Sequence, residues 1–348
     1  MLFYSYYDSA RAGAIVDYMA MKNADAAMDA VPLYYNVDGY LDGKIADVIE
    51  NMGEVGRNGE TFIFITDIHW ENNAQKSPLL IRQILDNTNV NNLLCGGDLI
   101  NQGETKADAV SYMQDCIDAY KYKNLFMPCA FGNHDSNENF SPPQPEKALS
   151  AGEQYALMQK QAEEITHYWS ETGWNFYVDK AATKTRFVFL DTGKNGVFGQ
   201  YDDLTDVLLA TPEGYHIMIL GHWLGIAGSL TDSCQNIMDM ADAYNAGSSV
   251  TITVSGTSYT YDFSANTDRE ILLILGGHAH VDSSWTTTDG IPCVVTDCDN
   301  YVRTNSESPH AVRTINEQCF DVFTIDYATK AVKACRFGRG DDRTWTRS

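Results

Sequence analysis

From Thr61 onward, short apolar segments rich in β-branched and aromatic residues alternate with longer amphipathic segments. TFIFIT at 61–66 precedes the amphipathic SPLLIRQILDNT at 77–88, and NLLCGG at 92–97 precedes a predicted helix near 105–121. This alternation of strand-like and helix-like patterns is typical of layered α/β proteins. The sequence therefore predicts an α/β fold.

The same pattern continues along the chain. LFMPCAFG at 125–132 predicts a strand, and a helix is predicted at 151–170. NFYVD at 175–179 and TRFVFLD at 185–191 are separated by a short polar turn, so together they predict a β-hairpin. Further strands are predicted in HIMILGH (216–222), EILLILGGH (270–278), PCVVTD (292–297), CFDVFTID (319–326) and AVKACRFG (331–338).

No linker rich in Pro, Gly or Ser divides these segments, so we expect one domain at 61–340 with a C-terminal tail at 341–348. Residues 1–60 are expected to form an N-terminal helical arm. The segment 223–268 is longer than a simple crossover, and SVTITVSGTSYTYDFS within it predicts a protruding β-hairpin. This insertion either shapes substrate access or is a plain structural hairpin.

Five of the predicted strands end in a polar cluster. The clusters are Asp67-Ile68-His69, Gly97-Asp98, Gly132-Asn133-His134-Asp135, Gly221-His222 and Gly277-His278-Ala279-His280. Because the carboxyl ends of strands form the ligand-binding crevice of an open α/β sheet, side chains from five strands can converge there. Any one cluster alone is typical of an ordinary turn. Together they indicate a site for divalent ions, which accept carboxylate, amide and imidazole ligands.

The motifs D-x-H, G-D, G-N-H-D, G-H and G-H-x-H, in this order, resemble those of the calcineurin-like metallophosphoesterases over roughly residues 61 to 340. The resemblance implies a four-layer αββα sandwich of two mixed β-sheets flanked by helices. It also implies two divalent metal ions at the ends of the sheets and hydrolysis of a phosphate ester by a metal-bridging hydroxide.

The resemblance also implies a role for each polar residue. Asp67, His69 and His280 would hold the first ion, Asn133, His222 and His278 the second, and Asp98 would bridge the two ions. His134 would be the catalytic acid, which protonates the leaving oxygen or stabilises charge on the phosphoryl group. Asp135 is expected to orient its loop. Ligands rich in imidazole favour Mn, Fe or Zn over Mg.

Departures from related families narrow the substrate. Phosphoprotein phosphatases of this superfamily carry G-D-x-x-D-R-G, where the chain has Asn101 and Gln102 in place of Asp and Arg. Gln102 cannot form a bidentate fork to phosphate, so a protein phosphatase role is disfavoured. Purple acid phosphatases need a metal-binding Tyr at position 101, which excludes that branch. The pattern is similar to a broad bacterial group that cleaves small phosphate esters, and we expect a phosphodiester substrate.

The charge of the chain limits its partners. It has 348 residues, of which 24 are Lys or Arg and 47 are Asp or Glu, giving a net charge of −23. Such a surface repels polyanions, so nucleic acids and anionic membranes are disfavoured and a small phosphorylated substrate is expected. The apolar runs are shorter than the roughly 20 residues of a membrane span. The N-terminus lacks a signal-peptide pattern, so we expect a cytoplasmic protein.

Two alternative functions are open at this stage. One is a nuclease of the same superfamily, against which the net charge argues. The other is a non-catalytic metal-binding structural or interaction module, such as a phage- or envelope-associated component. A structural site does not require an acid beside its ions, so the presence of His134 favours an enzyme.

Other residues carry less information. The eight cysteines form no C-x-x-C pair and are expected to be reduced core residues. Trp70 and Trp223 each follow a proposed ligand. They either stack on a substrate base or sugar, or support the ligand loops from within the protein.

Overall fold

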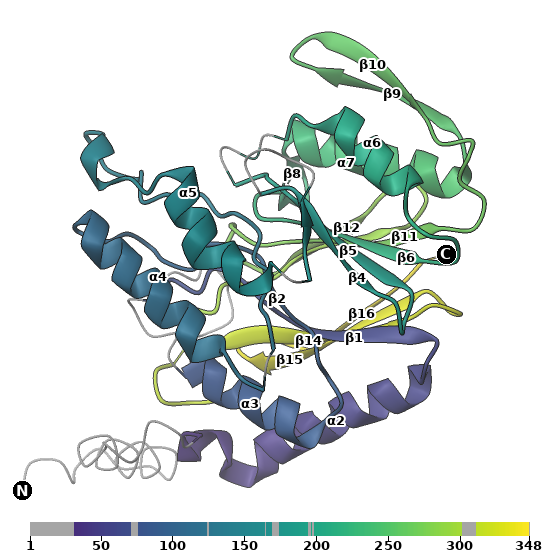
Figure 1. Ribbon diagram of the computed structural model, residues 1–348. Helices are drawn as coiled ribbons and strands as arrows, with labels where there is room; N and C mark the ends of the chain where they lie inside the picture. The colour runs from purple at the N-terminus through teal and green to yellow at the C-terminus, as the bar shows by residue number, and fades with distance from the viewer. Residues whose placement is uncertain are drawn as a thin grey trace, which may run out of the picture.

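The computed structural model describes residues 31–70, 76–123, 125–163, 165–168, 174–193, 196, 198–300 and 311–347. Two mixed β-sheets lie face to face, and helices cover the outer face of each (Figure 1). Phe62 and Phe64 from one sheet pack with Phe187 and Phe189 from the other in a buried core between them. The predicted four-layer αββα sandwich is therefore confirmed.

The first sheet joins the two ends of the domain. Its strand order is β16 (Arg343–Thr346), β15 (Ala331–Gly338), β14 (Cys319–Asp326), β1 (Gly59–Ile65) and β2 (Leu93–Cys95). Only β1 and β2 are parallel; the other pairs are antiparallel. The apolar faces of α2 (Tyr40–Val55), α3 (Ser77–Asn87) and α4 (Lys106–Tyr120) cover this sheet, burying residues such as Val48, Leu80 and Met113.

The second sheet has the order β12 (Ser283–Thr286), β13 (Pro292–Val295), β11 (Glu270–Gly276), β6 (His216–Gly221), β5 (Thr185–Leu190), β4 (Phe176–Lys180) and β3 (His167–Tyr168). Its central strands β5, β6, β11 and β13 are parallel, so their carboxyl ends lie at one edge. The amphipathic helices α6 (Tyr201–Leu209) and α7 (Asp232–Ala246) pack on its outer face. The predicted hairpin of β4 and β5 is present.

The segment 223–268 contains α7 and two short antiparallel strand pairs. β7 (Gly225–Ile226) pairs with β8 (Ser229–Leu230), and β9 (Ser249–Val254) pairs with β10 (Thr257–Asp262). The β9–β10 hairpin projects beyond the body of the protein in Figure 1. Ile252 and Tyr261 of this hairpin are buried and belong to the same apolar cluster as residues of α7. β9 and β10 thus form a hairpin where the sequence predicted one.

Two sequence predictions were wrong in detail. The segment 125–132 forms only isolated bridges, Leu125 with Tyr122 and Cys129 with Cys95. The helix predicted at 151–170 is a short helical segment, α5 (Ala151–Gln154) followed by a π-helix and a 3-10 turn ending at Ala162. Gln159 Nε2 donates to Cys129 O at 2.5 Å, and Gln161 Nε2 donates to Met127 O at 2.6 Å. Side-chain amides thus take the place of a neighbouring strand.

The ends of the chain complete the first sheet. The segment 341–348, expected to be a tail, contains β16, which pairs with β15. Within the predicted N-terminal arm, α2 packs on β14 and β15, while residues 1–30 lie outside the described residues. The division into arm, domain and tail stays a prediction. In the part of the chain that is described, no helix has the length and apolar character to cross a membrane.

Candidate metal centre

The five polar clusters meet at the carboxyl ends of strands from both sheets. Asp67 and His69 follow β1 and Asp98 follows β2, while His222 follows β6 and His278 and His280 follow β11. One ligand atom each from Asp67, His69, Asp98 and His280 lie within 4.8 Å of one another, and the same is true of Asp98, His222 and His278. Asn133 Oδ1 lies 3.1 Å from His222 Nε2. The structure therefore brings all seven predicted ligands together.

Asp98 belongs to both groups and lies between them. Its Oδ1 accepts a hydrogen bond from His134 N at 2.8 Å. Its Oδ2 is buried and accepts no hydrogen bond from any described residue, although His222 Nε2 is 3.3 Å away and His69 Nε2 is 4.0 Å away. An unbonded buried carboxylate oxygen is unfavourable by at least about 1–3 kcal/mol. A cation beside Oδ2 would remove that cost.

The histidine tautomers point to the same conclusion. His222 Nδ1 lies 2.8 Å from Gly96 O and His69 Nδ1 lies 3.2 Å from Ile100 O, and a carbonyl can only accept. The proton is therefore on Nδ1, and Nε2 of a neutral ring presents a lone pair to the centre. His69 Nε2 lies 3.2 Å from His280 Nε2. Lone pairs that face each other so closely need a proton or a cation between them, so this donor set fits divalent metal ions.

The electrostatics of the cluster follow from burial and charge. Burial alone would raise the pKa of Asp98, but His222, His134 and His69 lower that pKa to about 2. Burial alone would lower the pKa of His222, but Asp98 raises it to about 10. Burial lowers the pKa of His69 and of His278 to about 4. The two buried carboxylates of the centre, Asp67 and Asp98, thus favour a positive charge between them.

Most of the predicted ligands have an uncommon backbone conformation. The φ angle is 51° at Asp67, 45° at His69, 54° at Asp98, 70° at His278 and 54° at His280. Such left-handed conformations each cost on the order of 1–3 kcal/mol in non-glycine residues and gather at functional sites. Backbone hydrogen bonds hold them here: Asp67 N donates to Gly97 O at 3.0 Å and His69 N to Asp98 O at 3.1 Å.

Asp135 ties two of the loops together. Its carboxylate accepts hydrogen bonds from Gly132 N at 2.9 Å, Asp98 N at 3.0 Å and Leu99 N at 2.8 Å. Burial, followed by the charge of Asp98, raises the pKa of Asp135 to about 8. Its position matches the expectation that Asp135 orients its loop.

The glycine before Asn133 is required by this close packing. A Cβ on Gly132 would overlap both Oδ1 and the backbone nitrogen of Asp98. We expect Gly132→Ala to displace Asp98 and to weaken binding of Mn²⁺ by at least about tenfold, the usual lower bound for disturbing the surroundings of a metal ligand. Isothermal titration with Mn²⁺ measures this. Gly43→Ala is the control because a Cβ at that exposed position of α2 meets no atom within 4 Å. Equal Mn²⁺ affinity in both variants would contradict the expectation.

His134 lies at the edge of the centre, with its side chain 24% exposed. Its Nδ1 donates to the backbone carbonyl of Asn101 at 2.6 Å. Its Nε2 is 4.0 Å from Asp98 Oδ2, so this nitrogen faces the predicted ions. The ring therefore has a fixed orientation and a free edge toward the site. Its catalytic role stays a prediction.

The two tryptophans have different surroundings. Trp70 is buried in the core, with its ring 6.4 Å from that of Tyr120. Trp223 stacks on His278, with ring centroids 3.7 Å apart. Both contacts match the interpretation that these residues support the ligand loops.

Sequence reasoning missed a sixth polar cluster. PCVVTDCDN follows the same pattern of an apolar strand and polar end, and residues 296–300 after β13 are fully buried. Asn300 Nδ2 donates to His69 O at 3.0 Å, and Asp299 N donates to Thr66 O at 3.1 Å. This loop therefore holds the first ligand loop in place. The polar residues directly after the apolar run PCVV are the feature of the sequence that would have indicated this cluster.

A four-layer sandwich with Asp, Asn and His side chains converging from both sheets defines a binuclear metallophosphoesterase. The chain belongs to the calcineurin-like phosphoesterase family, whose family model matches residues 60–282. It is thus an enzyme that hydrolyses phosphate esters with the help of divalent metal ions.

One solved structure supports the fold, and a second resembles the chain more weakly. A dimetal phosphatase from Danio rerio is similar with a TM-score of 0.57 and 13% identity, over 83% of this chain and 99% of that chain. A phosphopantetheinyl hydrolase from Mycobacterium tuberculosis has a TM-score of 0.35 and 10% identity, over 69% of this chain and 90% of that chain. No curated protein matches the sequence.

Proposed function

We propose that the chain hydrolyses a small phosphodiester at this centre. Asp67, His69 and His280 would hold one ion, Asn133, His222 and His278 the other, and Asp98 would bridge them. The buried, unbonded Oδ2 of Asp98 between the two groups carries the proposal. When bound, two Mn, Fe or Zn ions supply charge stabilisation to the phosphoryl oxygens and activate water as the nucleophile.

His134 would act on the leaving group. Its Nδ1–H bond to Asn101 O orients the ring. Protonated Nε2 then donates its proton to the departing oxygen as the P–O bond breaks. The partial exposure of His134 leaves this nitrogen accessible to substrate, a feature that a purely structural metal site would not require.

Charge supports a diester substrate. A phosphomonoester carries close to two negative charges at pH 7, because its second pKa is about 6, whereas a diester carries one. The position of the phosphate-gripping Arg in phosphoprotein phosphatases is occupied here by Gln102, and the chain carries a net charge of −23. The less charged ester therefore meets less repulsion, while a polyanion such as a nucleic acid meets more.

The test compares two substrates with metal-stripped protein supplied with Mn²⁺, Fe²⁺, Zn²⁺ or Mg²⁺. We expect hydrolysis of bis-p-nitrophenyl phosphate to exceed that of p-nitrophenyl phosphate, with Mn²⁺, Fe²⁺ or Zn²⁺ more effective than Mg²⁺. A monoester preference would overturn the diester assignment. Two bound ions without turnover of either substrate would favour a binding role.

A further inference from the structure

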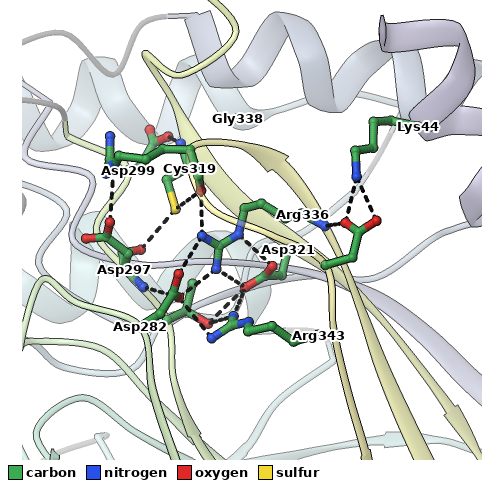
Figure 2. Close-up of polar contacts among 12 residues, drawn as sticks. Lys44, Asp282, Asp297, Asp299, Cys319, Asp321, Arg336, Gly338 and Arg343 are labelled. Atoms are coloured by element: carbon green, nitrogen blue, oxygen red, sulfur yellow. Dashed lines mark hydrogen bonds and ion pairs between the residues drawn. The ribbon is translucent and has the colours of Figure 1, made fainter. Parts of the chain in front are cut away.

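Two buried arginines, Arg336 and Arg339, and the partly buried Arg343 bind three aspartates beside the metal centre. Arg336 lies on β15, Arg339 follows that strand, and Arg343 begins β16. Figure 2 shows Arg336 and Arg343 directed toward Asp282 and Asp321. Arg339 Nε donates to Asp297 Oδ2 at 2.9 Å. The three positive and three negative charges balance.

Arg336 uses every donor of its guanidinium group. Nε and Nη2 donate to the two carboxylate oxygens of Asp321 at 2.8 and 3.1 Å. Nη1 and Nη2 donate to the two oxygens of Asp282 at 2.9 and 2.7 Å, and Nη1 also donates to Arg339 O at 2.6 Å. A guanidinium has five N–H donors in a fixed plane, so these five bonds leave the group no freedom to rotate.

The aspartates on the two sides of Arg336 belong to different sheets. Asp321 is fully buried within β14 of the first sheet. Asp282 lies in the loop after β11 of the second sheet, two residues beyond His280. Arg343 Nη1 and the backbone nitrogen of Asp297 also bind Asp282 Oδ1, at 2.9 and 3.1 Å. The loop that carries His280 is therefore fastened to the rigid strand of the opposite sheet.

A second series of hydrogen bonds connects the same group of arginines to His69, the ligand that faces His280. Arg339 binds Asp297, and its Nη2 donates to Cys298 O at 2.6 Å. Two residues further on, Asn300 donates to His69 O. The two paths end at His280 and His69, whose Nε2 atoms face each other.

We propose that Arg336, acting through Asp282, is a positioning residue for His280 and thereby for the ion held by Asp67, His69 and His280. This inference rests on the ligand set of the proposed function. Metal ligands must be held within about 0.5 Å of their productive positions. Buried ion pairs add little net stability compared with apolar packing of the same volume, so fixing the geometry is the effect we expect from this network.

The chain offers a closely matched control for testing this. Asp282 is 24% exposed and pairs bidentately with Arg336, which is 1% exposed. Asp179 is 23% exposed and pairs bidentately with Arg186, which is 3% exposed, near the start of β5 and so at the opposite end of the sheet from the ligands. Asp282→Ala leaves Arg336 paired with Asp321, which limits the loss of folding stability. Asp282→Asn, which keeps one oxygen acceptor, is a second variant should alanine prevent folding.

The measurement is Mn²⁺ binding to metal-stripped protein, by equilibrium dialysis with elemental analysis, alongside thermal unfolding of the metal-free variants. We expect both the wild type and Asp179→Ala to bind two ions, and we expect each of the two affinities to be the same in Asp179→Ala as in the wild type. We expect Asp282→Ala, or Asp282→Asn, to weaken one of the two equilibria about 10- to 100-fold and to leave the other within about threefold. Asp282→Ala and Asp179→Ala should lower the unfolding temperature of the metal-free protein by similar amounts.

Two results would overturn the positioning role. One is that the Asp282 variants bind both Mn²⁺ ions with the affinities of the wild type. The other is that Asp179→Ala weakens Mn²⁺ binding as much as the Asp282 variants do. Fewer than two ions bound to the wild type would instead remove the proposed ligand set, and the positioning role with it. Because metal binding is measured without substrate, a wrong choice of substrate does not affect the outcome.

Discussion

Asp98→Ala is expected to abolish metal-dependent hydrolysis, by more than about 10³-fold in kcat, while the chain stays folded. This exceeds the 10²- to 10³-fold effect of removing one donor that stabilises a transition state, because a bridging carboxylate would serve both ions. Burial and then the charge of Asp98 raise the pKa of nearby Asp135, so alanine relieves the second of these effects and the metal-free fold should tolerate it. Turnover of bis-p-nitrophenyl phosphate and Mn²⁺ stoichiometry measure the effect.

The control for this variant is Asp118→Ala on α4. Asp118 has a half-exposed side chain paired with Lys121, and such surface pairs contribute little. Circular dichroism in the near ultraviolet checks that Asp98→Ala keeps its tertiary packing. Unchanged turnover in a folded Asp98→Ala protein would contradict the binuclear mechanism.

His134→Ala is expected to lower kcat about 10²- to 10⁴-fold while both ions remain bound, because it removes a proton donor and none of the proposed ligands. The loss should depend on the leaving group. A p-nitrophenolate can depart unprotonated, whereas an alkoxide must be protonated as it departs. We therefore expect His134→Ala to slow release of p-nitrophenolate from an alkyl p-nitrophenyl diester less than it slows hydrolysis of a dialkyl diester.

His167→Ala provides the comparison, since His167 is exposed on the edge strand β3 and stacks on Tyr177. It should retain wild-type kcat for both substrates. A loss in His134→Ala that is the same for good and poor leaving groups would exclude general acid catalysis. His134 would then act by stabilising charge on the phosphoryl group.

The local patterns of the sequence predict an α/β fold and place the ligands at the ends of apolar strands, whereas the four-layer sandwich is implied by the resemblance to the metallophosphoesterases. They do not predict the hydrogen bonds that the side chains of Gln159 and Gln161 donate to the backbone at 127–129. Those bonds join residues about 30 positions apart, so no short-range periodicity reports them.

The arginine network was hidden for a similar reason. Arg336 and Asp282 are 54 positions apart, and in sequence each resembles a charged surface residue. Burial of such a pair depends on the complete tertiary structure. The left-handed backbone at Asp67 or His280 is likewise imposed by neighbouring loops, since neither residue type requires it.

The pairing of β1 with β14 has a consequence for the order in which the molecule is built. Phe62 pairs with Phe323, so β1 gains one of its two neighbours only after more than two hundred further residues have left the ribosome. Pairing over such a separation carries a large loop-closure entropy and forms late. The loop bearing Asp67 and His69 therefore cannot settle during early synthesis. The first ligand loop therefore reaches its final packing only after β14 has been synthesised.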